Sequence, residues 1–572
     1  MKIKHLFGLA VIAAMTASCS SNEDLGTAGP GTGTNETGVG YATFTINLPS
    51  VSGTRAADAG GAEMDEGTAK EYAVKSATAL IFQKYGSDEG SCKFVESVDL
   101  PTAAADWTDD TTGGITTTSK KLVAKLTNVD TKNQYYVLVL LNNNKTGGVK
   151  VPLPTVGQSY NEWNSQILNP SVDDLAADND FYMANAPLKG TASPTTLVTI
   201  NKENIYSSKE KAEAGTSAAT VYVERGVAKM SVNDPKTKTV IDKATNTSTQ
   251  STVEFNNWAL DITNKKTYAV HNIDGLSTDF PAIWTTPRFI GTNSRVYWGK
   301  DPNYNLDNLN KKEADREAEF NFIKATSGIN KTFKESAYCL ENTFNLANMY
   351  QGQTTRVIFK ATYTPKDDAG NPLAEQDGTF YTIGNMTNIL NEAALKTAVN
   401  TAATSVLPGC TVDYTNLKTE GSHVITLADI KDSTDKTLVA DKDYSGKTGT
   451  QIVKEINDKL GLTDGAGRPE AMVGINTYLN GVTYYIARVK HFGSLTPWSS
   501  GESYGTDNVK YLGRYGMLRN NWYELKVGNV YGPGYPGVPP VDPTLPDDEN
   551  EKYLSVSVKI LSWAKRSDTV DL

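Results

Sequence analysis

Histidine and cysteine, which carry much of the chemistry of enzyme and metal sites, are few in this chain, with four of each, and they are scattered. The four histidines are His5, His271, His423 and His491, and their spacing does not suit a shared metal ion. The chain has no H-E-x-x-H, G-x-S-x-G or phosphate-loop motif, and no G-x-G-x-x-G at a predicted strand–helix junction. The sequence therefore predicts no enzyme, no cofactor and no metal site.

One stretch does place oxygen-bearing side chains at the spacing of a calcium loop. In "DPNYNLDNLNKKE" the residues that stand two apart are Asp301, Asn303, Asn305 and Asp307. However, Leu306 stands where an EF-hand loop needs glycine, and Lys312 stands where it needs a bidentate glutamate. We therefore expect a hydrated surface loop here.

Cys19 is placed for a different chemistry, the acylation of a thiol. Residues 1–18 read as an export signal, with Lys2 and Lys4 followed by an apolar run and then by small residues. A cysteine directly after those small residues predicts a lipoprotein signal, although Thr16 stands where leucine is usual. A plain secretory signal with a chance cysteine is the alternative.

The remaining cysteines are too few for a disulfide framework. They are Cys92, Cys339 and Cys410. Packed core thiols are the favoured interpretation, and one disulfide with one thiol left over stays open.

Arg55 is the only arginine before Arg225, and its surroundings invite proteolysis. It lies in "SVSGTRAADAGG", a stretch of small residues with little capacity to pack. An arginine-specific protease that meets the N-terminal half therefore has one candidate bond, Arg55–Ala56.

The elements on either side of these residues are predicted strands with matching patterns. The strand at 41–48, ahead of Arg55, alternates the apolar residues Ala42, Phe44, Ile46 and Leu48 with polar ones. At the other end of the chain, the alternating residues are Leu554, Val556, Val558 and Ile560. Leu561 and Trp563 fall on the opposite face of a regular strand, so either a bulge re-aims them or they cover a second surface.

The whole composition favours β-structure in more than one domain. The chain has 572 residues and 28 tyrosines, and its short apolar runs are separated by Thr, Ser, Asn and Gly. We predict β-sandwich domains with small helical insertions at 388–400 and 451–461. The net charge of −10, without a basic cluster, gives no support to nucleic-acid binding.

The predicted boundaries follow from these patterns. After the signal, residues 19–55 form a propeptide with a Gly-rich tether and the strand at 41–48. Two β-sandwich domains follow at 56–215 and 216–530. The Pro/Gly-rich residues 531–550 read as an extended, poorly packed linker, and residues 551–572 as a terminal strand held away from the body.

The chain resembles a fimbrillin, the type V pilin of Bacteroidales, and specifically the major subunit of the minor, short fimbria type. The resemblance lies in "VYVERGVAKMSV", "NWALDITNKKTYAV", "TTRVIFKATYTP" with "GTFYTIG", "TYYIARVKHF", "YGMLRNNWYELKVGNV" and "LSVSVKILSWAKRSDTVDL". The matches sample most of the second domain and both termini. The N-terminal domain matches by arrangement more than by motif.

The resemblance implies a fold and a life cycle. It implies two transthyretin-like β-sandwich domains, export to the outer membrane as a lipoprotein, cleavage by an arginine-specific surface protease, and polymerisation into a fimbria that supports adhesion. Carried over, Cys19 is lipidated, Arg55–Ala56 is the maturation bond, and Ala42–Leu48 is the strand removed. The donor side chains are Leu554, Val556, Val558, Ile560, Leu561 and Trp563. The implied partners are further copies of the chain and the anchor and tip subunits.

Two other interpretations stay open. An anchor or tip subunit of the same fimbria differs from a shaft subunit in its terminal strands, because a tip needs no donor and an anchor can keep its N-terminal strand. A monomeric surface lipoprotein that binds glycans on exposed Tyr and Trp is the alternative from another functional class.

Overall fold

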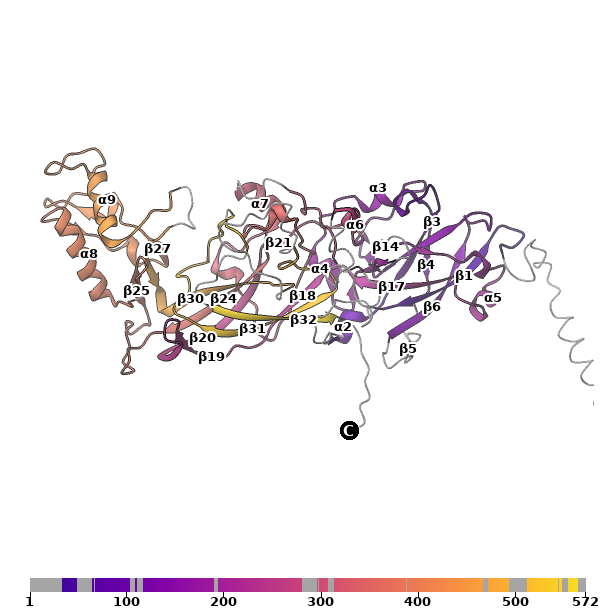
Figure 1. Ribbon diagram of the computed structural model, residues 1–572, viewed down its shortest axis with the longest axis horizontal. Coiled ribbons are helices and arrows are strands. Elements are labelled where there is room, and N and C mark those ends of the chain that lie inside the picture. Colours follow the sequence, from indigo (N-terminus) through magenta and orange to yellow (C-terminus); the bar gives the residue numbers. More distant parts are fainter. Residues whose placement is uncertain are drawn as a thin grey trace, which may run out of the picture.

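The computed structural model shows an elongated molecule with the helical insertion at one end and the N-terminal sheet at the other (Figure 1). It describes residues 33–48, 64–65, 67–102, 108–110, 117–189, 194–279, 296, 298–306, 313–386, 388–466, 472–492, 512–543, 545–547 and 554–563. Cys19, Arg55 and Ala56 lie outside these residues, as do the side chains of 554–563. No helix among the described residues is long and apolar enough to cross a membrane.

The first sheet is built from the N-terminal part of the chain. Its strand order is β4-β3-β7-β12-β17-β1-β6-β5. The strands are β1 (Gly40–Asn47), β3 (Ala77–Gln83), β4 (Lys93–Leu100), β5 (Thr108–Asp110), β6 (Thr117–Leu126), β7 (Tyr135–Leu141), β12 (Met183–Asn185) and β17 (Ala219–Arg225). The first residues of β17 pair with β1 and its last three pair with β12, so one strand joins the two halves of the sheet. The halves enclose one apolar core.

The second sheet has the order β2-β32-β31-β19-β20-β24-β30, with β18 paired to β31 and β23. The strands are β2 (Met64–Asp65), β18 (Ala228–Val232), β19 (Thr237–Asp242), β20 (Thr247–Asp261), β23 (Ala337–Cys339), β24 (Arg356–Thr364), β30 (Val482–Arg488), β31 (Asn521–Val530) and β32 (Leu554–Trp563). Trp258, Phe359, Tyr485 and Tyr523 fill a separate apolar core. The predicted fold class, mainly β with β-sandwich domains, is confirmed.

The stretch "ATVYVERGVAKMSV" is two strands in two different sheets. β17 belongs to the first sheet and β18 to the second, and Gly226 and Val227 lie between them. A Cβ on Gly226 would lie 2.8 Å from the ring of Tyr182, so the chain turns here where only glycine fits. The chain thus leaves the first sheet after Arg225, beyond the boundary predicted near residue 215.

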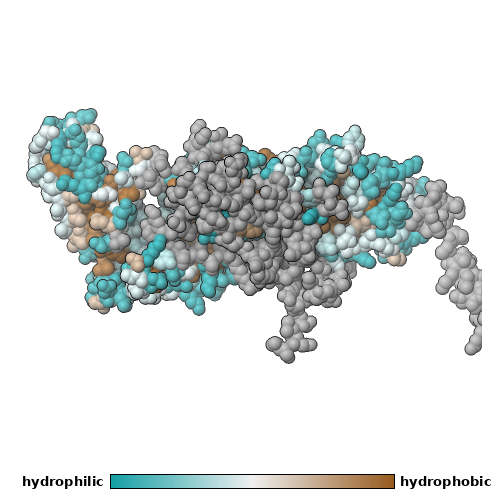
Figure 2. Space-filling model, viewed as in Figure 1, coloured by the Kyte–Doolittle hydropathy of each residue, from teal (hydrophilic) through white to brown (hydrophobic). Residues whose placement is uncertain are grey.

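The helical insertion has its own core. The predicted helices are confirmed as α8 (Glu392–Val406) and α9 (Gly449–Leu460), which pack with β25 (Phe380–Ile383), β27 (Gly421–His423) and β29 (Ile475–Tyr478). Gly461 ends α9 with a φ of 70°, the left-handed conformation that glycine adopts freely. Figure 2 shows mainly hydrophilic residues at the outer end of the insertion.

The remaining elements are short. The strands are β8 (Asn144–Lys145), β9 (Gly148–Val149), β10 (Ala176–Ala177), β11 (Asp180–Phe181), β13 (Leu188–Lys189), β14 (Pro194–Thr195), β15 (Val198–Thr199), β16 (Ile205–Tyr206), β21 (Thr263–Asn264), β22 (Phe320–Asn321), β26 (Thr411–Val412) and β28 (Ile430–Lys431). The helices are α2 (Ala69–Tyr72), α3 (Tyr160–Asn164), α4 (Val172–Leu175), α5 (Lys209–Ala214), α6 (Leu276–Asp279) and α7 (Glu313–Glu319).

The Pro/Gly-rich segment after β31 is packed, contrary to the prediction of a poorly packed linker. Its described residues from 531 to 547, which we call the strap, lie on the C-terminal domain, and Gly532, Gly534, Pro539, Asp542 and Asp547 are buried. The composition suggests a free linker because it contains few apolar side chains. The strap is held mainly through its backbone, and its glycine and proline residues allow that close approach. Among its side chains, Tyr535 and Val538 also pack against a small apolar cluster.

Candidate functional site

The predicted N-terminal strand is β1, and it lies inside the first sheet. It pairs antiparallel with β6 along its whole length and parallel with β17 from Phe44 to Asn47. Ala42, Phe44 and Ile46 are fully buried, and Leu48 just beyond the strand is 3% exposed. All four residues that the alternation places on one face therefore contribute to the core.

Loss of β1 would change the first sheet more than loss of an edge strand. β6 and β17 would each lose a hydrogen-bonding neighbour, and the apolar core would open along the eight residues of the strand. Unpaired strand edges beside an apolar groove bind another extended chain readily.

The predicted C-terminal strand is β32, and it lies beside its own domain. It pairs antiparallel with β31, where Val556, Val558 and Ile560 stand opposite Val527, Leu525 and Tyr523. Those three residues of β31 are buried. The expectation of a strand held away from the body is therefore wrong for this structure, because β31 offers β32 a long antiparallel partner (Figure 1).

The register of β32 bears on Leu561 and Trp563. Pairing with β31 is continuous from Val556 to Ser562, so these paired residues include no bulge that re-aims Leu561, which stands opposite Trp522. The register shift lies at the start of the strand, between Val556 and Leu554. Trp563 is the partner of Asp65 in the parallel pairing with β2.

A buried ion pair joins the two domains close to β2. The Nζ of Lys229, at the start of the second domain, lies 2.8 Å from Oε1 of Glu71, and both side chains are 3% exposed. The Tyr338 hydroxyl donates to the same carboxylate at 2.5 Å, and the Thr68 N–H donates to its other oxygen at 2.7 Å. The ammonium of Lys229 also lies 3.4 Å from the ring centroid of Trp522.

Arg225 strengthens the same junction. Its Nε donates to the carbonyl of Glu71 at 2.9 Å, and its backbone N–H donates to the side-chain oxygen of Asn520 at 3.0 Å. These residues come from distant parts of the sequence, so the pattern along the chain gave no sign of the junction. The motif from Thr68 to Glu71 has the spacing of a capping box, which predicts a helix start but not a buried charge.

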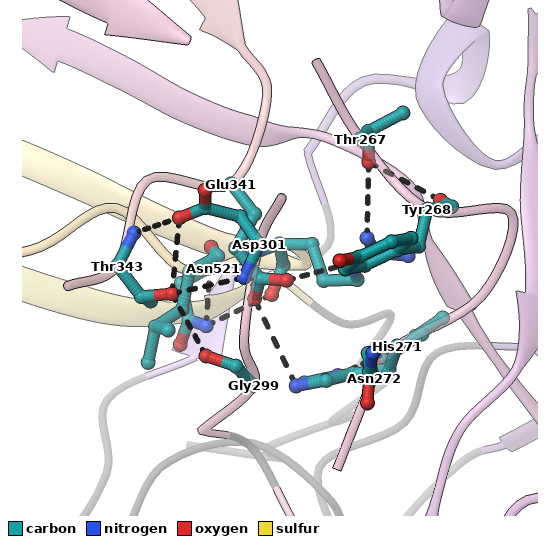
Figure 3. A network of polar contacts seen from close by, with 12 residues as sticks. Thr267, Tyr268, His271, Asn272, Gly299, Asp301, Glu341, Thr343 and Asn521 are labelled. Carbon is teal, nitrogen blue, oxygen red and sulfur yellow. Dashed lines mark hydrogen bonds and ion pairs between the residues drawn. The ribbon is translucent and has the colours of Figure 1, made fainter. Parts of the chain in front are cut away.

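The stretch predicted as a hydrated loop is buried at Asp301 and Asn303. Asp301 is 3% exposed, and its carboxylate accepts the N–H group of Asn303 at 2.6 Å. It also accepts the N–H group of Thr343 at 2.6 Å, and both of these residues are labelled in Figure 3. Burial raises the pKa of Asp301 to about 7, although these N–H groups act in the opposite direction. Among the described residues, no group of three His, Cys, Asp or Glu side chains could hold a metal ion.

Charged groups continue from Asp301 toward the first domain. His271 places Nδ1 2.8 Å from Oε1 of Glu224. Its Nε2 lies 3.8 Å from Oε1 of Glu341, and both of these residues are labelled in Figure 3. Arg519 lies on the other side of Glu341, with its Nε 3.3 Å from Oε2. A Cβ on Gly299 would lie 2.2 Å from the His271 ring, so glycine is required beside it.

His271 makes the stability of the junction depend on pH. Burial lowers the pKa of His271 to about 4. The charge of Glu341 opposes this shift, and the charge of Arg519 adds to it. The unfolded chain binds this proton near pH 6.5, so the contribution of neutral His271 is complete above pH 6.5 and falls toward pH 4. We expect the stability difference between the wild type and His271→Gln to change by about 3 kcal/mol over this range, measured by urea unfolding at several pH values.

The pKa of Asp301 is also shifted, so this carboxyl group adds its own pH dependence to the stability of both proteins. Its contribution cancels when the stability of one protein is subtracted from that of the other. Parallel stability curves for the wild type and His271→Gln between pH 6.5 and 4 would contradict this role for His271.

The three described cysteines were predicted to be packed core residues. Cys92, Cys339 and Cys410 are free and buried, so packed core cysteines are confirmed and no disulfide joins these three. Burial raises the pKa of the Cys339 thiol to about 12, which keeps it protonated and unreactive.

The comparisons with known proteins place the C-terminal region in a family. Residues 476–569 match the family model "Major fimbrial subunit protein type IV, Fimbrillin, C-terminal". This region contains β30, β31, the strap and β32. No curated protein matches the chain.

Two solved structures are similar at low identity. A fimbrial assembly protein from Parabacteroides distasonis is 11% identical, with a TM-score of 0.28, and the match covers 61% of this chain and 93% of that one. The C-terminally truncated tip fimbrial protein Mfa3 from Porphyromonas gingivalis is 12% identical, with a TM-score of 0.27, and the match covers 91% and 100%. The match over residues 476–569 shows that this C-terminal region is similar to the C-terminal part of fimbrillins, the family that the resemblance predicted.

Proposed function

We propose that this fimbrillin is the shaft subunit of a cell-surface fimbria and that it polymerises by exchange of its terminal strands. The observation that carries the proposal is β1. This strand lies between β6 and β17 and buries four alternating apolar side chains, yet it precedes the only arginine in the first 224 residues.

Cleavage after Arg55 would separate β1 from the rest of the chain. Once β1 leaves, the first sandwich has an open groove, and β32 of another copy is a strand with the same alternation of apolar residues. Its insertion restores the backbone hydrogen bonds and the apolar contacts that β1 made. Repeated head to tail, the exchange does not close into a ring and so builds a filament.

The N-terminal residues suggest the steps of export and maturation that we propose. The chain is exported, Cys19 is acylated, and the lipid holds the precursor in the outer membrane. An arginine-specific surface protease then removes the anchored segment. The subunit joins other copies and the anchor and tip subunits, and the fimbria serves adhesion. The function is structural, without a catalytic site.

The two alternatives have less support. An anchor subunit keeps its N-terminal strand and a tip needs no donor, whereas this chain has both a strand ahead of Arg55 and the terminal strand β32. For the glycan-binding lipoprotein, the exposed aromatic side chains among the described residues are Tyr85 and Tyr222. They lie in separate strands or turns, and most of the other rings pack in the cores.

Two variants test the proposal. Arg55→Ala should leave the precursor uncut and monomeric after treatment with an arginine-specific protease, whereas the wild type is cut and forms filaments seen by electron microscopy. Deletion of 551–572 should leave cleavage intact but abolish filaments.

Two results would contradict the proposal. Wild-type protein that is cut after Arg55 and stays monomeric would overturn the shaft function. Filaments of normal length from the deletion variant would show that β32 is not the donor. Circular dichroism and a thermal melt of the uncut deletion variant control for folding.

A further inference from the structure

The strap is attached to the edge of the second sheet by backbone pairing. Tyr535 and Tyr484 of β30 exchange both hydrogen bonds, at 2.7 and 2.9 Å. The hydroxyl groups of Tyr478 and Tyr485 donate to the carbonyls of Gly534 and Gly532, at 2.9 and 2.8 Å. A Cβ on Gly534 would lie 2.0 Å from the Tyr484 carbonyl oxygen, so this approach requires glycine.

A buried arginine makes the second attachment. Arg356 Nε lies 2.8 Å from Oδ2 of Asp261, with side-chain exposures of 4% and 0%. The other two guanidinium nitrogens of Arg356 donate to the carbonyls of Pro539 and Pro540, at 2.6 and 3.2 Å. The ion pair orients the guanidinium group, and its remaining donors bind the strap.

A third attachment lies at the end of the strap. The Gln351 N–H donates to the Leu545 carbonyl at 3.0 Å, and its side-chain amide donates to the Pro546 carbonyl at 3.2 Å. The Asp547 N–H donates to the Met349 carbonyl at 3.1 Å. The last attached residue, Asp547, is fully buried.

We propose that the strap stays on its own domain while β32 is exchanged, so that the arm carrying the donor strand begins at Asp547. This inference rests on the proposed function. Only residues 548–553 separate Asp547 from β32. A chain of this length spans at most about 25 Å, and therefore the acceptor groove of the next subunit begins within about 25 Å of Asp547. Arg356 is a positioning residue, because it holds the point from which the donor strand extends.

Two engineered disulfides separate this inference from the proposed function. Tyr484→Cys with Tyr535→Cys locks the strap to β30, and Lys526→Cys with Ser557→Cys locks β32 to β31. Tyr484 and Tyr535 are partners in a single antiparallel bridge, and Lys526 and Ser557 are partners in the β31–β32 ladder, so each pair stands directly opposite, where a disulfide can form. The reduced form of each variant is its matched control, and Cys92, Cys339 and Cys410 are buried.

After cleavage, the oxidised strap variant should form filaments at the rate of its reduced form, and the oxidised β32 variant should form none. If oxidation of the strap variant blocks filaments that the reduced form makes, the inference is overturned and the proposed function stands. If the oxidised β32 variant still polymerises, the exchange of β32 itself is wrong.

Hydrogen exchange gives a second measurement on unmodified protein. The amides of Tyr535 and Asp547 should be equally protected in monomer and filament. A tenfold or greater loss of their protection on polymerisation would contradict a strap that stays in place, even if the tyrosine replacements unfold the domain.

Discussion

Replacing Phe44 with alanine is expected to destabilise the precursor by about 3–5 kcal/mol, because the ring is fully buried in the first core and its loss leaves a cavity. Phe44 stands between Leu122 of β6 and Ala219 of β17, so the surrounding strands cannot close the space without giving up their pairing. Chemical denaturation of the uncut protein measures the loss.

The matched control is Thr45→Ala in the same strand. Thr45 is only partly buried, and its hydroxyl contacts that of Ser217 at 2.7 Å, so we expect a loss of about 1 kcal/mol. Under the proposed function Phe44 leaves with the N-terminal segment. Filaments assembled from cleaved Phe44→Ala protein should therefore dissociate in denaturant at the wild-type concentration. Weaker filaments from this variant would mean that β1 remains in the mature subunit.

Replacing Glu71 with alanine is expected to cost about 3–5 kcal/mol, because it removes the carboxylate from the buried ammonium of Lys229. Burial alone would raise the pKa of Glu71, but Lys229, Tyr338 and Thr68 together hold it below the ordinary value of 4.5. The contribution of ionised Glu71 is therefore complete above pH 4.5 and is lost as the pH falls through the folded pKa. Urea unfolding at pH 7 and at pH 3 measures both effects.

Two further variants show whether the ion pair is the cause. Lys70→Ala in the same short helix breaks the exposed pair with Asp178 and should cost at most about 1 kcal/mol. Glu71→Gln combined with Lys229→Met removes both charges and should recover most of the loss. Equal losses from Lys70→Ala and Glu71→Ala would contradict the role of burial.

Local patterns predicted those parts of the fold that depend on local chemistry. The alternation at Ala42–Leu48 predicted a strand with a buried face, and the local pattern at 451–461 predicted the helix α9. Neither depends on a distant partner. The burial of Asp301 and Glu71 does depend on partners far along the chain, so a polar residue in a polar stretch read as solvated.

The strap and the β17–β18 turn were missed for a related reason. Packing is predicted from sequence by the pattern of apolar side chains. The strap is held mainly by backbone hydrogen bonds, which leave no such pattern. In "VERGVAK" the apolar pattern continues through Gly226, although the chain changes sheets there. Only the close contact with Tyr182 distinguishes this glycine from an ordinary one in a strand.

In a filament of the proposed kind, the domain junction transmits mechanical force along the fibre. Tension enters each subunit through the strand held in its first sandwich and leaves through β32, which belongs to the second. The whole load therefore crosses between the domains, where Glu71, Lys229, Tyr338 and Arg225 form their buried contacts. Under the proposed cleavage, Glu71 remains in the mature chain, so the removal of the N-terminal segment would leave this contact between the domains intact.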